Sequence, residues 1–309
     1  MTVRVGLVTV TYNSGSVLSD FLDSFASLSG VDARLYVVDN NSTDGTPERL
    51  KAIRDPKVSV ILNEDNAGIA IGNNQGIEAA RVDSCDWILL INNDTLFDPD
   101  FVSRLVGTAS DRGLKIVSPL IAATEPPGSD WYSDGKIHAW RAMQAKHVGM
   151  GDTLRAPIGD PYVVDYASTC ALLVHPSVFE AVGLMDPVYF VYGDDVDFCL
   201  RATRAGFDYH VEPRAVLVHK ASSLTGEFTG PFAARWISRN WVVVARRHAT
   251  KLQLLTGAVF IGAWTVARLL TRRDSLKVTR WRVAAFLEGS RVDLSVPPPR
   301  FADGPVDAL

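Results

Sequence analysis

Residues Asp86–Thr95 read DWILLINNDT, an apolar run followed at once by an acidic, amide-rich tip. A short apolar run bounded by polar turn residues is typical of a strand buried inside a parallel sheet. The run therefore predicts a central strand whose carboxyl end carries Asn92, Asn93 and Asp94. Because carboxylate oxygen is a good ligand for divalent cations, Asp94 is the best-placed candidate for holding a metal ion.

Short β-rich runs alternate with helical patterns over the first 120 residues. The runs are Val3–Thr11, Arg34–Val38, Lys57–Leu62, Asp86–Ile91 and Lys115–Val117. The helical patterns between them are Leu18–Leu28, Thr46–Ile53, Gly68–Arg81 and Pro99–Arg112. Strand-helix alternation predicts an α/β fold, a mostly parallel sheet flanked by helices and joined by right-handed crossovers.

Each of the first four runs ends in a cluster of Asn, Asp, Ser or Gly: residues 11–15, 39–45, 63–68 and 92–95. In parallel sheets ligands bind beyond the carboxyl ends of the strands, so these clusters are expected to meet at one edge. Turn and N-cap chemistry is the alternative for any single cluster. Four such clusters in succession favour a binding site for a polar ligand. The glycine-rich phosphate loops GxGxxG and GxxxxGK[ST] do not occur, so phosphates on that ligand would need a divalent cation.

A second acidic cluster, Asp194-Asp195-Val196-Asp197, precedes a helical pattern that Gly206 would end. At the N-terminus of a helix the dipole favours ionised carboxylates, and an ionised carboxylate can accept a proton. Simple N-capping is the alternative explanation for one of these acids. His219 ends the run Ala215–Val218. A single histidine after a strand is usually a surface residue or a hydrogen-bonded core residue. His219 becomes a candidate for the site only if it reaches Asp94.

The composition is that of an ordinary globular chain: 309 residues, 47% of them hydrophobic and 21% charged. These values exclude a disordered, collagen-like or disulfide-stapled protein. Three cysteines at positions 85, 170 and 199 match neither a zinc ribbon nor a CxxC pair, which predicts reduced thiols and a reducing compartment. The N-terminus shows no secretory signal pattern.

Charge divides the chain into two unequal parts. Residues 235–282 carry a net charge of +10, and the remainder carries −14. The basic part suits an anionic membrane face, because the acidic remainder would repel the phosphate backbone of a nucleic acid. A basic helix surrounded by water is the alternative.

An uncharged segment, Leu252–Ala267, lies within the basic part. As a helix it would reach about 24 Å, short of the roughly 30 Å of a bilayer core. We therefore expect an interfacial helix, with tryptophans among the cations at 236, 241, 264 and 281, and not a spanning one. A helix packed on the catalytic domain is the alternative. Pro297-Pro298-Pro299 predicts an irregular tail.

The sequence resembles inverting family-2 glycosyltransferases of the GT-A fold, the branch that includes bacterial rhamnosyltransferases. The resemblance covers residues 3–250 and is carried by motifs in a specific order: VTVTYN at 8–13, VVDNNSTDG at 37–45, NAG at 66–68 with Asn73, LINNDT at 90–95 and GDDVDFCLR at 193–201.

The resemblance implies a role for each candidate residue. The base and ribose of a nucleotide-sugar donor would be held by Thr11, Tyr12, Asn13, Asp39 and Asn41, with Asn66 and Asn73 closing the pocket. Asn92-Asn93-Asp94 stands where the family carries DxD, so Asp94 and His219 would bind Mg²⁺ or Mn²⁺ and Asn93 would lie near the ribose. Asp195 would be the general base, with Asp194 and Tyr192 near the acceptor.

Two positions depart from the family pattern. Asn92 replaces the first Asp of DxD, which removes one anionic oxygen and predicts modest metal affinity. Asp194 stands where relatives usually carry Glu, so its acceptor contact differs. Trp131, His138 and Trp140 lie in the region where acceptor specificity is expected, without an assigned role.

The residues and the resemblance together predict metal-assisted, inverting transfer of a sugar from a dTDP-rhamnose or UDP-sugar donor to a saccharide or polyprenyl-linked saccharide. The predicted division is a GT-A domain over 1–232, with a nucleotide-sugar half (1–118) and an acceptor half (119–232), followed by a basic helical region with an irregular tail (233–309). The enzyme is expected in the cytoplasm, peripheral at the inner membrane face and without nucleic acid. A nucleotide-sugar-binding relative without catalysis and a sugar nucleotidyltransferase are the rival functions.

Overall fold

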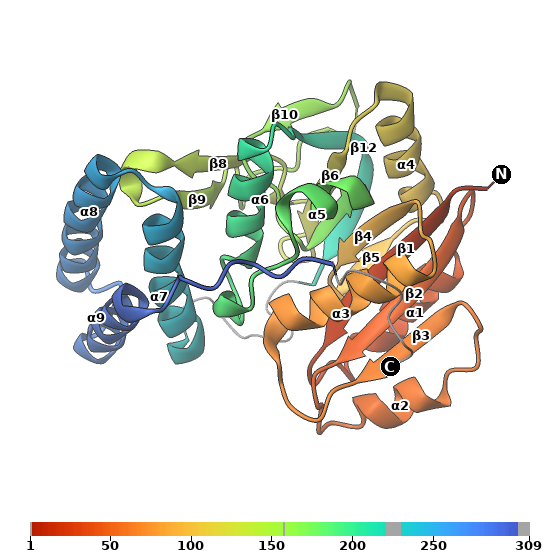
Figure 1. The fold of residues 1–309 in the computed structure, drawn as a ribbon, viewed down its shortest axis with the longest axis horizontal. Helices are drawn as coiled ribbons and strands as arrows, with labels where there is room; N and C mark the ends of the chain where they lie inside the picture. The colour runs from red at the N-terminus through yellow and green to blue at the C-terminus, as the bar shows by residue number, and fades with distance from the viewer. Residues whose placement is uncertain (1, 157, 221–229, 302–309) are drawn as a thin grey trace.

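A computed structural model describes residues 2–156, 158–220 and 230–301 (Figure 1). A ten-stranded mixed sheet forms its centre, with strand order β10-β12-β6-β11-β4-β1-β2-β3, β5 pairing with β12 and β7 with β6. The inner strands are wholly buried: Leu7, Leu35 and Leu89 have no exposed surface. Burial of these apolar runs on both faces is the main force that holds the sheet together.

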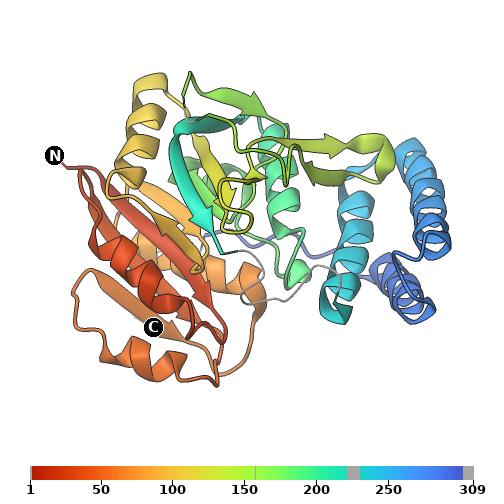
Figure 2. The same cartoon turned by 180° about the vertical axis from the view of Figure 1, so that it is seen from behind.

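The first half has the predicted alternation of strands and helices. It consists of β1 (Arg4–Thr11), α1 (Leu18–Ala26), β2 (Asp32–Asp39), α2 (Thr46–Ala52), β3 (Val58–Leu62), α3 (Gly68–Val82) and β4 (Trp87–Ile91). These four strands are parallel, as predicted. Helix α3 covers one face of the sheet in Figure 1, and α1 lies on the opposite face in Figure 2.

Helix α3 lies unusually close to β1 because it carries glycines where it crosses the strand. A Cβ atom added at Gly76 would lie 2.3 Å from Cγ1 of Val8, and one at Gly72 would lie 2.8 Å from Val10. Only glycine permits this approach. The close contact fixes the start of α3 near the tips of β1 and β2.

The second half continues the sheet with mixed directions. Its elements are β5 (Thr95–Phe97), α4 (Phe101–Arg112), β6 (Ile116–Ala123), β7 (Asp130–Tyr132), β8 (Gly135–His138), η1 (Ala139–Arg141), β9 (Gln144–His147), β10 (Tyr162–Val164), β11 (Ala171–Val174), α5 (Pro176–Val182), η2 (Pro187–Tyr189), α6 (Asp194–Arg204) and β12 (Tyr209–His219). Strand β11 lies antiparallel between β4 and β6. It thereby brings Cys170 to the tip of β4.

Strand β6 is longer than the predicted run Lys115–Val117. It continues through Pro119 to Ala123. Proline has no N–H for a sheet ladder, which is why the prediction stopped there. In the structure Pro119 pairs with Glu212, where the register of β12 shifts before Val216. Ladder pairing is already interrupted at such an irregularity, so the proline is tolerated.

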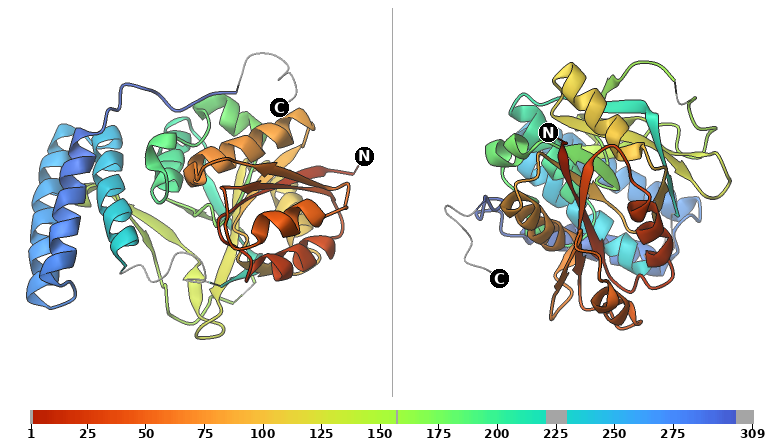
Figure 3. Two further views of the ribbon diagram at one scale, coloured as in Figure 1. Left: turned by 90° about the horizontal axis from the view of Figure 1, so that it is seen from below. Right: turned by 90° about the vertical axis from the view of Figure 1, so that its right-hand side faces the viewer.

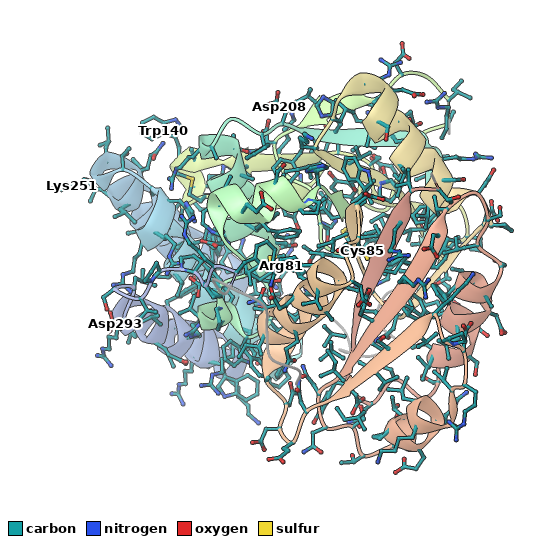
Figure 4. The ribbon with its side chains drawn as sticks, turned by 45° about the vertical axis from the view of Figure 1, so that its right-hand side comes forward. Arg81, Cys85, Trp140, Asp208, Lys251 and Asp293 are labelled. Atoms are coloured by element: carbon teal, nitrogen blue, oxygen red, sulfur yellow. The ribbon has the colours of Figure 1, made fainter. Side chains whose placement is uncertain are left out.

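Three helices stand side by side at the end of the molecule far from the N-terminus (Figure 3): α7 (Pro231–His248), α8 (Lys251–Leu270) and α9 (Leu276–Arg291). Helix α8 packs on the hairpin that contains η1, where a Cβ at Gly257 would lie 2.7 Å from that of Ala142. Figure 4 accordingly shows Trp140 and Lys251 at the same end of the molecule.

The predicted length of the uncharged helix was wrong. Helix α8 has 20 residues, about 30 Å, because it includes Lys251 and Arg268. Arg268 is accommodated by an ion pair with Asp274 at 2.8 Å. The argument from a 24 Å length against spanning therefore fails.

The C-terminal tail is irregular, as predicted, but residues 292–301 are docked on the catalytic part. The Leu184 backbone N–H donates to the carbonyl of Pro299 at 2.7 Å, and the ring centroids of Phe301 and Phe179 lie 6.4 Å apart. Residues 302–309 lie outside the described residues. The division at 118 and 232 stays a prediction.

Candidate active site

The tips of β1 and β2 are tied together by a buried carboxylate. Asp39 Oδ1 accepts hydrogen bonds from the hydroxyls of Thr11 (2.7 Å) and Ser42 (2.6 Å), and its Oδ2 accepts from the Ser42 N–H. Asn13, in the left-handed region at φ 53°, accepts a hydrogen bond from the Thr43 N–H at 2.8 Å. The two predicted polar clusters therefore form one rigid wall.

The loop before α3 joins the same edge. The Asn40 amide donates to the carbonyl of Gly68 at 3.0 Å, and the Ile69 N–H donates to the carbonyl of Phe190 at 2.7 Å. Asn66 is exposed and accepts a hydrogen bond from the Gly68 N–H, so here it starts the helix. Asn73 is buried on α3. The loop at Phe190 thus links the donor side to the acidic helix α6.

The tip of β4 lies at the centre of this edge. The Asn93 amide donates to the carbonyl of Val10 at 2.6 Å, while its Oδ1 is buried with no hydrogen-bond partner among the described residues. The Asn92 N–H donates to the carbonyl of Cys170 at 2.9 Å. His219 Nε2 lies 3.1 Å from Asp94 Oδ1, and both side chains are less than 10% exposed. His219 therefore reaches Asp94, which was the condition for counting it as a candidate site residue.

Burial opposes the charged form of His219, but the Cys170 sulfur and the Asp94 carboxylate beside it raise its pKa to about 10. Burial raises the pKa of the Cys170 thiol, and the charges of Asp94 and Asp195 add to that effect. Cys170 therefore lies within electrostatic reach of both carboxylates. Both carboxylates therefore act on the same thiol, and their joint part in one site stays a prediction.

Asp195 is the second residue of α6, and both of its carboxylate oxygens accept hydrogen bonds. Its Oδ2 accepts a 2.6 Å hydrogen bond from the Tyr166 hydroxyl, and its Oδ1 accepts from the Val196 N–H. Burial raises the pKa of Asp195, against the lowering effect of the Tyr166 donor. Burial and the charge of Asp195 together raise the pKa of Asp194 well above its usual range.

The backbone before these acids is held by a residue from α7. Gly193 adopts φ 86°, a conformation that favours glycine. The Asn240 amide donates at 2.8 Å to the carbonyls of Val191 and of Tyr192, which has φ 62°. Asn240 thus fixes the turn that aims Asp194 and Asp195 into the site.

A chain of aromatic rings connects the two carboxylates. The Tyr166 ring stacks on His147 with centroids 5.7 Å apart, His147 meets Trp131 at 4.8 Å, and Trp131 meets His219 at 4.5 Å. Burial lowers the pKa of His147 to about 4, so this ring is neutral near pH 7. We call Tyr166, His147, Trp131 and His219 the aromatic chain.

The residues at the β4 tip fit a divalent cation of the Mg²⁺ or Mn²⁺ type. Asp94 offers a carboxylate, and His219 offers an imidazole whose proton a bound cation would displace. The unpartnered Asn93 Oδ1 belongs to the residue before Asp94. Across residues 2–156, 158–220 and 230–301 no cluster of three or more His, Cys, Asp or Glu could hold a metal ion. Such a cation would need further ligands from substrate phosphates and water, as is usual for Mg²⁺.

Sequence reasoning missed several residues of the site. Tyr166, His147 and Cys170 belong to no motif: His147 lies on the β8–β9 hairpin, and Tyr166 and Cys170 lie between β10 and β11. Trp131 was noted without a role and proves to pack on His219. Two predicted donor residues, Tyr12 (48% exposed) and Asn41, lie at the open surface of the site.

Comparisons with known proteins point to one family. The family model described as Glycosyl transferase family 2 matches residues 7–181. The N-acetylglucosaminyl-diphospho-decaprenol L-rhamnosyltransferase of Mycobacterium tuberculosis is 29% identical over 94% of this chain and 99% of its own length. The dTDP-rhamnosyl transferase RfbF of Shigella flexneri is 23% identical over 94% and 97%.

Among solved structures, GalNAc-T7 with UDP, GalNAc and Mn²⁺ aligns with a TM-score of 0.67 at 17% identity, covering 93% of this chain and 56% of that one. At this identity the likeness shows the fold alone. The family match, the relatives and the mixed α/β sheet lead to one conclusion: the chain belongs to glycosyl transferase family 2, is a glycosyltransferase of the GT-A fold, and is similar to rhamnosyltransferases.

Proposed function

We propose that this enzyme transfers a sugar, of the L-rhamnosyl type, from a nucleotide-sugar donor to a hydroxyl of a lipid-linked saccharide, with inversion at the anomeric carbon. Two relatives named as rhamnosyltransferases match the chain over nearly its whole length, one with a diphospho-decaprenol sugar in its name. The observation that supports the proposal is the pair of carboxylates, Asp94 beside His219 and Asp195 bonded to Tyr166, which the aromatic chain connects.

The donor would lie along the tips of β1, β2 and β4. Thr11, Asp39 and Asn13 form the wall for the base and ribose, and Asn93 offers an acceptor oxygen. Asp94 and His219 would hold Mg²⁺ or Mn²⁺ beside the diphosphate. When bound, the cation would stabilise the negative charge of the leaving nucleoside diphosphate.

Asp195 would act as the general base. Its carboxylate accepts the proton of the acceptor hydroxyl while that oxygen bonds to the anomeric carbon and the bond to the diphosphate oxygen breaks. One displacement inverts the configuration, as in other single-step glycosyl reactions. Tyr166 and the Val196 N–H hold the carboxylate in place during this step.

The experiment combines a donor panel with two variants. Wild-type protein is expected to gain thermal stability from one dTDP-, UDP- or GDP-sugar together with Mn²⁺ and to release the nucleoside diphosphate. Asp195→Asn is expected to keep donor binding and lose transfer. Tyr162→Phe, which removes a hydroxyl bonded to the Ser133 carbonyl and not to Asp195, is the matched control and keeps both.

Two results would favour the rival functions. Wild-type protein that binds a nucleotide-sugar and shows no transfer to any lipid-linked saccharide would indicate a binding relative. Release of pyrophosphate in place of a nucleoside diphosphate would indicate a nucleotidyltransferase.

We propose further that α8 and α9 rest on an anionic membrane face at the cytoplasmic side. Within the described residues, α8 is long and apolar enough to cross a membrane, and 6% of it is buried. Its exposed Leu255, Val259 and Val266 share one side of the helix, and exposed Arg272 and Arg273 follow in the turn to α9. Apolar side chains next to cations suit an interfacial site.

Sedimentation with vesicles tests this placement. Binding to phosphatidylglycerol vesicles that weakens with salt and with Arg272→Glu/Arg273→Glu is expected. Equal binding to neutral vesicles would contradict the attraction between the cations and anionic lipid. Protein that stays in solution with both kinds of vesicle would contradict the proposal that α8 and α9 rest on a membrane.

A further inference from the structure

An aromatic groove of about 700 Å³ is lined by residues of α7 and α9, two helices that pack on each other. Its walls include Phe190, Phe232, Trp236 and Trp281, and Arg235 and Glu288 lie at its polar edge. Grooves of this size with apolar walls and few polar groups are typical of sites for small molecules. None of these residues takes part in the donor site described above.

The inner end of the groove adjoins the catalytic loop. The Phe190 ring stacks on Trp236 with centroids 4.9 Å apart, and the Phe190 carbonyl accepts the hydrogen bond from Ile69 on the donor side. Asp194 and Asp195 follow Phe190 by four and five residues, in a turn that Asn240 of α7 holds. The groove therefore shares Phe190 with the loop that leads to the proposed base.

The outer side of α9 is apolar and exposed. Trp281 faces the groove, whereas Val283 (44% exposed) and Leu287 (51% exposed) lie on the solvent side of the same helix. One helix therefore contributes both to the groove and to the surface proposed to meet lipid.

Positive charge lies along the groove. Arg235 and Arg239 each lie 3.3 Å from Glu288, and both guanidinium groups lie over the Trp236 ring at 5.5 and 5.2 Å. Two cations against one carboxylate leave a net positive edge. Such an edge complements an anionic group at the end of an apolar chain.

We infer that the aromatic groove between α7 and α9 binds the first isoprenoid units of a polyprenyl-diphosphate acceptor, with the diphosphate at Arg235. This inference rests on the proposed function and locates its lipid acceptor. The groove would hold the lipid so that the sugar beyond the diphosphate reaches Asp195.

The test uses two acceptors that share one sugar diphosphate and differ in the lipid. One carries a long polyprenyl chain, and the other a methyl group. In Phe232→Ala and Trp281→Ala we expect KM for the polyprenyl acceptor to rise about tenfold or more, with the methyl acceptor changed less than twofold. Val82→Ala, an exposed apolar change at the end of α3, is the control and alters neither.

Direct binding supplies a second readout. Farnesyl diphosphate is expected to change the tryptophan fluorescence of the wild type, and about tenfold more of it is expected to be needed for Phe232→Ala. Inorganic diphosphate alone is expected to leave the fluorescence unchanged.

The failures are distinguishable. A wild type that glycosylates neither acceptor overturns the proposed function. A wild type that glycosylates both, with groove variants equal to it on the polyprenyl acceptor, overturns the groove alone. A dimer in light scattering that Phe232→Ala converts to monomer also overturns it, because a second copy would then fill the groove.

Discussion

The hydrogen bond from Tyr166 to Asp195 gives the sharpest prediction. Tyr166 is 5% exposed, and its hydroxyl lies 2.6 Å from Asp195 Oδ2. Tyr166→Phe removes the donor and keeps the ring stacked on His147. Because the site is buried, water has little access to replace the lost hydroxyl donor. The ionised form of Asp195 therefore loses a stabilising hydrogen bond. We expect the pKa of Asp195 to rise above its already raised wild-type value.

The size of the rise follows from the strength of such bonds. A hydrogen bond to a charged group contributes about 1.5–3 kcal/mol. One pKa unit corresponds to about 1.4 kcal/mol, so the expected rise is about 1–2 units. A general base works when ionised, and activity falls as the pH falls through its pKa. The acid limb of kcat/KM should therefore move upward by about 1–2 pH units.

The assay measures kcat/KM as a function of pH at fixed concentrations of acceptor and Mn²⁺. Tyr162→Phe removes another tyrosine hydroxyl that bonds a backbone carbonyl, so it controls for loss of a hydroxyl as such. A Tyr166→Phe enzyme that is folded and has the wild-type acid limb would refute the role of Asp195 as base, or the bond that tunes it. An equal shift in Tyr162→Phe would refute the specificity of the effect.

Three further outcomes follow from the structure. Gly76→Ala should lower the free energy of unfolding in urea by about 1–3 kcal/mol, because the added Cβ would overlap Val8. Gly107→Ala, where the added Cβ meets open space, should raise it by about 0.5–1 kcal/mol. Burial raises the pKa of Asp197, but His248 and Arg201 lower it more, so the folded pKa lies below the ordinary Asp value. The stability that ionised Asp197 adds to the fold is therefore complete above about pH 4 and is lost as the pH falls through the folded pKa. Urea unfolding midpoints measured across this pH range check the prediction. Removing divalent cations with EDTA should abolish transfer, and Asp94→Asn should weaken the Mn²⁺ dependence of donor binding about tenfold, measured by titration calorimetry.

Much of the fold could be predicted because it depends on local patterns. Apolar runs and three-and-four spacings gave the strands and helices from β1 to α4 within a few residues. Strand β6 extended beyond its predicted end because Pro119 lies at a register shift, which is a property of the partner strand. Helix α8 extended because Arg268 pairs with Asp274, six residues beyond it.

By itself the sequence determined which chemistry is available. Asn and Asp clusters after four parallel strands, an aspartate at the tip of β4 and a pair of aspartates at a helix N-terminus follow from residue order alone. Parallel strands end at one edge, so the convergence of the clusters could also be foreseen.

Only the tertiary structure decided which of these groups meet. His219 reaches Asp94 because β12 pairs with β5 and β6, and Tyr166 reaches Asp195 across 29 residues. No local periodicity specifies such contacts, since they depend on strand order, on the antiparallel insertion of β11 and on the burial of Trp131 between two histidines. Tyr166, His147 and the contact of Trp131 with His219 were therefore visible in three dimensions and not in the motifs.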